Sequence, residues 1–197
     1  MRVNNNFPKK ETISDEQIAT SVQKGNLEDF GELVLRYGKK IQNYLFRFIQ
    51  TKEEVEDLTQ DIFLKAYSNI LSFNPKKKFT PWLYQIAHNE LVNYLRKKHY
   101  LSTKFINLDL DILAAKSVSK NDILKDLENN LKFELIDKKL NKLNFKYRQP
   151  FVLFFYENLS YQEISDILKI PISTVGTRIK RAKEIIKKSV NNSESFN

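Results

Sequence analysis

Polar and basic side chains that could bind nucleic acid recur at helical spacing near the carboxyl end of the chain. Four of them fall at i, i+3, i+4 and i+7, namely Thr174, Thr177, Arg178 and Arg181. In a helix they form one row, which Ser173 and Lys180 flank. Hydroxyl and guanidinium groups can bond base edges in a major groove while lysines reach phosphates. The pattern by itself also fits an ordinary solvated helix face.

Two short helices joined by a break are expected around this row. Residues 160–163 read Ser-Tyr-Gln-Glu, a capping box in which a hydroxyl and a carboxylate each satisfy a backbone N–H. Lys169-Ile170-Pro171 then interrupts the helical pattern, and Ser173 is expected to cap the last helix. This arrangement predicts a helix-turn-helix.

A second group of basic residues alternates with aromatic ones in the middle of the chain. Lys76, Lys77 and Lys78 precede Phe79 and Trp82, and the following helical stretch ends in Arg96-Lys97-Lys98. Cations that follow a backbone and aromatic rings that stack on bases are what single-stranded DNA binding requires. Aromatic residues at this spacing more often belong to a core, and we expect Trp82 to be largely packed.

Acidic residues gather at the start of an expected helix, and their positions separate two roles. Carboxylates in a first turn are favoured by the helix dipole, which accounts for Glu53 and Glu54. Asp57, Gln60 and Asp61 lie further in and share one face, which the helix dipole does not account for. A metal site is the rival interpretation, but carboxylates without a nearby His would bind Mg²⁺ or Ca²⁺ weakly.

Catalytic machinery is not expected. The chain has no Cys, which excludes disulfides, thiol nucleophiles and thiolate metal sites. His88 and His99 have no carboxylate at a telling spacing, and no phosphate-binding glycine loop occurs. We therefore predict no catalytic residue, no metal and no cofactor.

The elements that must position these residues are helical. Stripes of apolar residues at spacings of three and four run through 30–48, 55–70 and 82–95. Only 4 Gly and 5 Pro leave little material for hairpins. Thr80 is expected to cap the third stripe, with Pro81 at its first position. These features predict an all-α fold with a three- to four-helix module followed by a helix-turn-helix module.

The domain boundaries follow from composition. We expect a tail and first helix start at 1–19, the first module at 20–100, a flexible linker at 101–130, the second module at 131–190 and a disordered tail at 191–197. Within the linker, a short helix is expected near 111–116. As a coil, its 30 residues would span roughly 30 Å on average and about 100 Å when pulled straight.

The charge distribution suggests two polyanion-binding modules on a tether. The net charge is +9, divided into +4 over 1–100, −1 over 101–130 and +6 over 131–197. An AT-rich genome that favours Lys is the alternative explanation, since basic composition is a weak signal of DNA binding. No run approaches the roughly 18 apolar residues of a membrane span, and 1–10 lacks a signal-peptide core. A cytoplasmic location is expected.

The chain resembles the extracytoplasmic-function (ECF) group of bacterial RNA polymerase sigma factors. Residues 147–153 and 159–182, including Leu159-Ser160-Tyr161-Gln162-Glu163-Ile164, resemble region four of that group. Residues 25–30, 56–67 and 79–89, including Phe79-Thr80-Pro81-Trp82-Leu83, resemble region two. Lys169 stands where the group usually has Gly, and Gly176 where a long polar residue is common.

The resemblance implies a promoter-recognition subunit of RNA polymerase. Region four would sit on the polymerase β flap and read the minus-35 element, while region two would trap the melted minus-10 element with the Lys76–Lys78 loop, Asn89 and the Arg96–Lys98 end. It also implies that Asp57, Gln60 and Asp61 dock on the β′ coiled coil and that an anti-sigma factor controls the protein. The rivals are a self-sufficient helix-turn-helix repressor and an all-α metal-dependent hydrolase.

Overall fold

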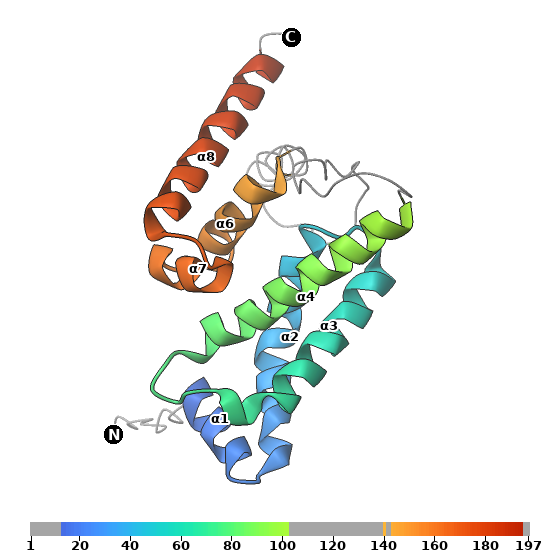
Figure 1. The fold of residues 1–197 in the computed structure, drawn as a ribbon, viewed down its shortest axis with the longest axis vertical. Helices are drawn as coiled ribbons and strands as arrows, with labels where there is room; N and C mark the ends of the chain where they lie inside the picture. Colours follow the sequence, from blue (N-terminus) through green and yellow to red (C-terminus); the bar gives the residue numbers. More distant parts are fainter. Residues whose placement is uncertain (1–12, 103–139, 141–142, 195–197) are drawn as a thin grey trace, which may run out of the picture.

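Every regular element in the described part of the chain is a helix. The computed structural model describes residues 13–102, 140 and 143–194. Figure 1 shows α1 to α4 as one group, in blue and green, and α6 to α8 as a second, in orange and red. The all-α, two-module prediction is therefore confirmed. The expected linker, its short helix near 111–116 and the start of the second module lie outside the described residues.

The first module packs four α-helices around an apolar and aromatic core. Its elements are α1 (Asp15–Gln23), α2 (Phe30–Phe46), α3 (Lys52–Ser68) and α4 (Phe79–Ser102), with 3-10 turns at Leu27–Asp29 and Ile70–Ser72. The stripe predicted on α2 is buried at Phe30, Leu33, Tyr37, Ile41 and Leu45. Val34, at the edge of that stripe, is exposed. Each buried side chain of this size contributes about 1.5–3 kcal/mol.

The first module differs from expectation at the start of α4. The helix begins at Phe79, so Thr80 lies inside the first turn and does not cap it. Its hydroxyl lies 2.6 Å from the Tyr37 hydroxyl instead. The backbone N–H of Phe79 donates to Glu16 Oε1 at 3.0 Å. A carboxylate on α1 thus does the capping, and the half-buried Thr80 directs its hydroxyl to Tyr37 on α2 instead.

The second module contains α6 (Phe145–Phe155), α7 (Tyr161–Leu168) and α8 (Ile172–Glu194). The Ser160 capping box is confirmed, with both reciprocal bonds formed. The expected cap at Ser173 is wrong, because α8 begins at Ile172 and Ser173 lies inside its first turn, where its carbonyl accepts the Thr177 hydroxyl at 2.8 Å. Helix α8 continues to Glu194, which lies within the stretch expected to be a tail.

The two modules lie against each other rather than apart. Residues of α6 and α7 share one continuous buried cluster with the first module, and α7 packs along α4. Phe48 after α2 meets Phe145 of α6 edge to face, with ring centroids 5.6 Å apart. The sequence suggested modules on a tether, and periodicity alone could not show which apolar side chains would meet across it.

Among the described residues, no helix is long and apolar enough to cross a membrane.

Candidate nucleic-acid interface

The row predicted on the last helix lies on the outer surface of α8. Thr177, Lys180 and Arg181 are exposed, and Thr174 and Arg178 are half-buried at its base. The opposite stripe, Val175, Ile179 and Ala182, is buried against α6 and α7. The amino-terminal half of α8 therefore presents hydroxyl and guanidinium groups from one face, as a recognition helix must.

A hollow of about 410 Å³ lies beside this row. Ser173, Thr174, Thr177 and Arg178 line it from α8, and Lys146 and Tyr147 line it from α6. Neither Lys146 nor Tyr147 was among the predicted site residues, because they precede the row on α8 by more than 25 positions. Their location adds a cation and an aromatic ring to the same surface.

The two departures from the family pattern lie in different structural surroundings. Gly176 faces α7, where an added Cβ would lie 3.4 Å from Cε2 of Tyr161, so this position serves the contact between the two helices. Lys169 ends α7 in the left-handed conformation, with φ 52° and ψ 44°. That conformation is the one in which Gly is favoured and an L-residue costs about 1 kcal/mol.

The basic loop of the first module is exposed on an aromatic base. Lys76, Lys77 and Lys78 are exposed, while Phe79 directly after them is fully buried. Trp82 packs against Phe79 with ring centroids 5.4 Å apart, so its predicted packing is confirmed. The aromatic residues thus anchor the loop, and its lysine side chains are the groups exposed to solvent.

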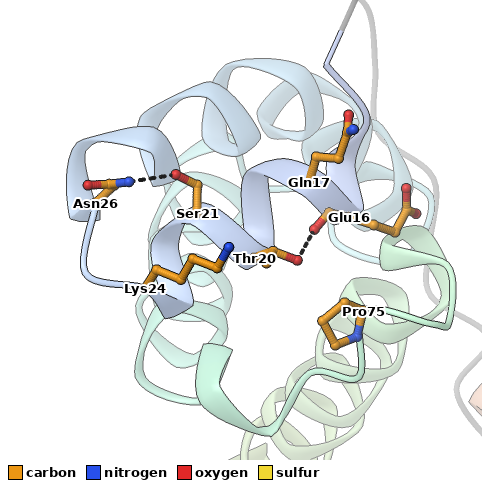
Figure 2. Close-up of a pocket in the computed structure, with 7 residues that line it drawn as sticks. All are labelled: Glu16, Gln17, Thr20, Ser21, Lys24, Asn26 and Pro75. Atoms are coloured by element: carbon orange, nitrogen blue, oxygen red, sulfur yellow. Dashed lines mark hydrogen bonds between the residues drawn. The ribbon is translucent and has the colours of Figure 1, made fainter.

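Two hollows flank the loop and α4. One of about 580 Å³ runs between α3 and α4, with the exposed Asn89 and Arg96 beside Trp82 and Asn69. The other, of about 460 Å³, lies between α1 and the loop (Figure 2). Its lining is Glu16, Gln17, Thr20, Ser21, Lys24, Asn26 and Pro75.

The hollow of Figure 2 is polar and already ordered. Figure 2 shows the Pro75 ring facing side chains of α1 across the gap. The Thr20 hydroxyl donates to the Glu16 carbonyl at 2.7 Å, and Asn26 Nδ2 donates to Ser21 Oγ at 2.9 Å. Sequence reasoning missed these residues, because Pro75 follows α1 by about 50 positions and spacing does not show that the two meet.

The carboxyl end of α4 gives its three basic residues different surroundings. Arg96 and Lys97 are exposed. Lys98 Nζ lies 2.8 Å from Glu54 Oε1 on α3, and this ion pair holds the pKa of Glu54 below its usual value against the opposing effect of burial. Lys98 is thus turned toward α3, whereas Arg96 faces the hollow beside Asn89.

The acidic face of α3 is separate from the structural carboxylates. Glu54 pairs with Lys98, and Glu56 lies 3.6 Å from Lys52. Asp57, Gln60 and Asp61 are exposed, and within the described residues none of the three takes part in an ion pair or side-chain hydrogen bond. One turn further, Leu64 is 65% exposed. Acidic side chains beside an exposed apolar one suit a protein contact.

No group of three or more His, Cys, Asp or Glu side chains that could hold a metal gathers within the described residues. The described carboxylates on α3 lie along one helix instead of converging.

A polar contact between the modules was not anticipated. His88 on α4 lies against Gln149 of α6, and burial, reinforced by the nearby Lys169 and Arg96, lowers its pKa to about 4. Tyr84 donates to the carboxylate of Glu157, and burial raises the pKa of that carboxyl group. Neither His88 nor Glu157 carries a sequence signal, because each depends on a partner more than 60 positions away.

The fold and these surfaces define an all-α, two-module DNA-binding protein with a helix-turn-helix. The Sigma-70 region 2 family matches residues 33–99, and the Sigma-70, region 4 family matches residues 133–186. ECF RNA polymerase sigma factor SigW of Bacillus subtilis is 35% identical over 173 residues, which cover 86% of this chain and 92% of that protein. ECF RNA polymerase sigma-E factor of Escherichia coli K12 is 32% identical over 187 residues, covering 91% of this chain and 96% of the other.

Solved structures share the fold. CnrH in complex with the cytosolic domain of CnrY superimposes with a TM-score of 0.67 at 23% identity, covering 91% of this chain and 99% of CnrH. The sigma factor RpoE of Bartonella quintana, in complex with the anti-sigma factor NepR, gives a TM-score of 0.65 at 21% identity, covering 83% of this chain and 98% of RpoE. The chain therefore belongs to the ECF group of bacterial RNA polymerase sigma factors. As such it binds core RNA polymerase and directs promoter-specific transcription initiation.

Proposed function

We propose that the two modules read the promoter in different physical states. The outer row of α8, with Ser173, Thr174, Thr177, Arg178, Lys180 and Arg181, reads the minus-35 element as duplex. The Lys76–Lys78 loop, Asn89 and the Arg96–Lys98 end of α4 hold the melted minus-10 element. The observation that carries this division is that a helix-turn-helix row and a basic loop beside hollows occur on separate modules.

The hollow of Figure 2 suits an unpaired base extruded from the strand. Its volume of about 460 Å³ exceeds that of one nucleobase, Pro75 offers an apolar wall, and polar side chains of α1 offer hydrogen bonds. Lys76 and Lys77 continue from Pro75 and are exposed to the flanking phosphates, while Lys78, exposed as well, pairs with Glu163 of α7 at 2.9 Å. Unpairing costs a few kcal/mol per base, which contacts of this kind offset without ATP.

Two protein partners are proposed. Asp57, Gln60 and Asp61 dock on the β′ coiled coil of the polymerase, supported by their exposure and by their freedom from internal ion pairs within the described residues. The second module sits on the β flap. An anti-sigma factor controls the protein, as the complexes of CnrH with CnrY and of RpoE with NepR suggest. The chain itself performs no catalysis and works in the cytoplasm with the polymerase.

Run-off transcription tests the proposal. Core polymerase is incubated with genomic fragments, with and without this protein, and start sites are mapped on the fragments that respond. We expect transcripts from a small set of fragments only when the protein is present, with shared sequence near −10 and −35. Absence of any protein-dependent transcript, together with specific binding to a palindromic duplex without polymerase, would favour the repressor instead.

A further inference from the structure

Gly176 leaves a notch in the surface of the recognition helix. It lies in the amino-terminal half of α8 and is half-buried. A Cβ added there would lie 3.4 Å from Cε2 and 3.8 Å from Cδ2 of the Tyr161 ring on α7. Beyond the backbone of α8 and the two neighbours of Gly176, no other described atom comes within 4 Å of that position. The missing side chain therefore leaves a space that has one wall, and this wall is the edge of an aromatic ring.

The Tyr161 ring is held by the core but is open to solvent. Tyr161 is the first residue of α7, directly after the Ser160 capping box. Phe154 of α6 packs against its ring edge to face, with ring centroids 5.1 Å apart and an interplanar angle of 62°. Nevertheless, 37% of Tyr161 is exposed. The wall of the notch is thus fixed in position and accessible from outside the protein.

The notch lies among side chains that we assign to DNA binding. Ser173 and Lys180, at i−3 and i+4 from Gly176, lie one turn before and one turn after it on α8. Both are exposed. A recognition helix places its amino-terminal residues against base edges in the major groove. When α8 binds the minus-35 element, which is the proposed function on which this inference rests, the notch therefore opens toward base pairs.

Carbon atoms form the sides of the notch, and this limits what it can bind. The sides are the ring edge of Tyr161 and the Cα of Gly176, so a hydrogen-bonding group of a base would lose water there without gaining a partner. The major groove presents one apolar group, the C5-methyl of thymine. Contact with the ring edge removes that methyl group from water, which is favourable. Because the other three bases lack the methyl group, the contact selects thymine.

We propose that Gly176 and Tyr161 form a methyl-binding notch that selects thymine at one base pair of the minus-35 element. The rest of the α8 row contacts the neighbouring base pairs and phosphates through hydroxyl, ammonium and guanidinium groups, whereas this position is read by apolar contact. Glycine is necessary in this role, because a side chain at position 176 would cover the ring edge and keep the base at a distance. Gly176 is thus a specificity-determining residue although it has no side chain.

Deoxyuridine tests the proposal, because it differs from thymidine only in the missing C5-methyl group. Each thymidine of a minus-35 element, on either strand, is replaced singly in a promoter mapped by run-off transcription. Closed-complex formation by the reconstituted holoenzyme is then compared with that on the unmodified promoter. At one position we expect affinity to fall about three- to fivefold, the effect of one buried methyl group. No loss of affinity at any position would overturn the proposal.

Three variants assign the methyl contact to the notch. Gly176→Gln covers the ring edge with an amide and keeps α8 intact, because Gln is a better helix former than Gly. Holoenzyme with this variant should bind the thymidine and deoxyuridine promoters equally. Tyr161→Phe keeps the ring edge and should keep the native difference between the two promoters. Gly31→Gln makes the same change at an exposed helical glycine of the first module and should also keep that difference.

The outcomes separate the notch from the proposed function. A deoxyuridine penalty that persists in Gly176→Gln would place the methyl contact elsewhere, and a penalty that disappears in Tyr161→Phe or Gly31→Gln would not come from the ring edge. Each of these results contradicts the proposal. If Arg178→Ala and Arg181→Ala leave use of the upstream element unchanged, reading by α8 is wrong and the notch with it. If these two variants are impaired and deoxyuridine has no effect, α8 still reads the element and only the notch is wrong.

Discussion

Lys169 shows how a single backbone conformation sets local stability. It ends α7 with φ 52°, where a side chain is strained. We expect Lys169→Gly to raise the free energy of unfolding by about 1 kcal/mol and the melting temperature by a few degrees, as measured by thermal denaturation. Asn158 has nearly the same φ of 54°, but Asn tolerates this region, so Asn158→Gly should gain much less. Equal gains at both positions would contradict the strain argument.

His88 makes the contact between the modules sensitive to pH. Its neutral ring accepts from Gln149, and burial with the positive charges of Lys169 and Arg96 lowers its pKa to about 4. A depressed pKa gives stability that is complete above the unfolded value of about 6.5 and is lost as pH falls toward 4. Between pH 7 and 5 we expect a loss of about 1–2 kcal/mol.

The measurement for His88 compares thermal unfolding of the native chain and His88→Gln from pH 7 to 5. Glu157 titrates in the opposite sense, because its raised pKa favours the packed state as pH falls. The difference between the two proteins isolates His88, since Glu157 is common to both. A difference that does not change with pH would contradict the prediction.

Asp57 and Asp61 allow a direct test of the proposed contact with core polymerase. Exposed on α3 and outside the core, they can be changed without disturbing the fold. We expect Asp57→Lys with Asp61→Lys to weaken binding to core polymerase by at least tenfold while helix content stays unchanged, as measured by co-purification and circular dichroism. Glu53→Lys with Glu28→Lys carries the same charge change on other exposed positions and serves as the control. Unaltered co-purification of the Asp57 and Asp61 variant would remove the docking assignment.

At the scale of elements, α8 and the α4 region should act at different steps of transcription initiation, closed-complex formation and strand opening. Arg178→Ala or Arg181→Ala removes a side chain from the row on α8, and a lost base contact of the bidentate kind costs about 1–3 kcal/mol. We expect these variants to reduce formation of the closed promoter complex. Asn89→Ala, or exchange of the Lys76–Lys78 loop, should spare that complex and reduce opening, measured by permanganate reactivity of unpaired thymines.

A pre-melted template separates the two classes. It should partly rescue the Asn89 and loop variants, because their defect lies in holding the open strand. It should not rescue Arg178→Ala or Arg181→Ala. If both classes behave alike on duplex and pre-melted templates, the division between α8 and α4 is wrong.

The elements themselves were largely predictable, since their signals are local. The α2 stripe, the Ser160 capping box and the helix break at Lys169 each depend on residues within one or two turns. The starts of α4 and α8 were misplaced because their determinants are not local. Glu16, more than 60 positions away, caps Phe79 and releases Thr80 to Tyr37.

The candidate site was predictable only where one short stretch of sequence supplied it. The α8 row and the α3 face follow from periodicity. The hollows do not, because each needs two elements: Pro75 with α1, Asn89 with α3, and Lys146 with α8. The contact of His88 with Gln149 likewise joins two modules. Sequence spacing contains no information about which faces will meet.

At the scale of the whole molecule, the charge of +9 is spread over two modules that pack against each other. Only part of this charge can contact the phosphates of one DNA duplex at a time. About four cations lie on or near the α8 row, and with a slope of about −0.9 per phosphate, affinity should fall about 100-fold between 50 and 200 mM salt. We therefore expect the free protein to bind duplex DNA weakly, with a dissociation constant of about 1–100 μM at physiological salt.

Titration of promoter and scrambled duplexes at several salt concentrations, with and without core polymerase, tests this expectation. Free protein should distinguish the two duplexes poorly, since one module contributes few base contacts and the other is built for unpaired strands. With polymerase, both modules engage one promoter, and the second binding event becomes intramolecular, which raises affinity and specificity without new contacts within either module. Nanomolar, sequence-specific binding by the free protein at physiological salt would mean that the helix-turn-helix is sufficient alone, and a polymerase-dependent division of labour would then be wrong.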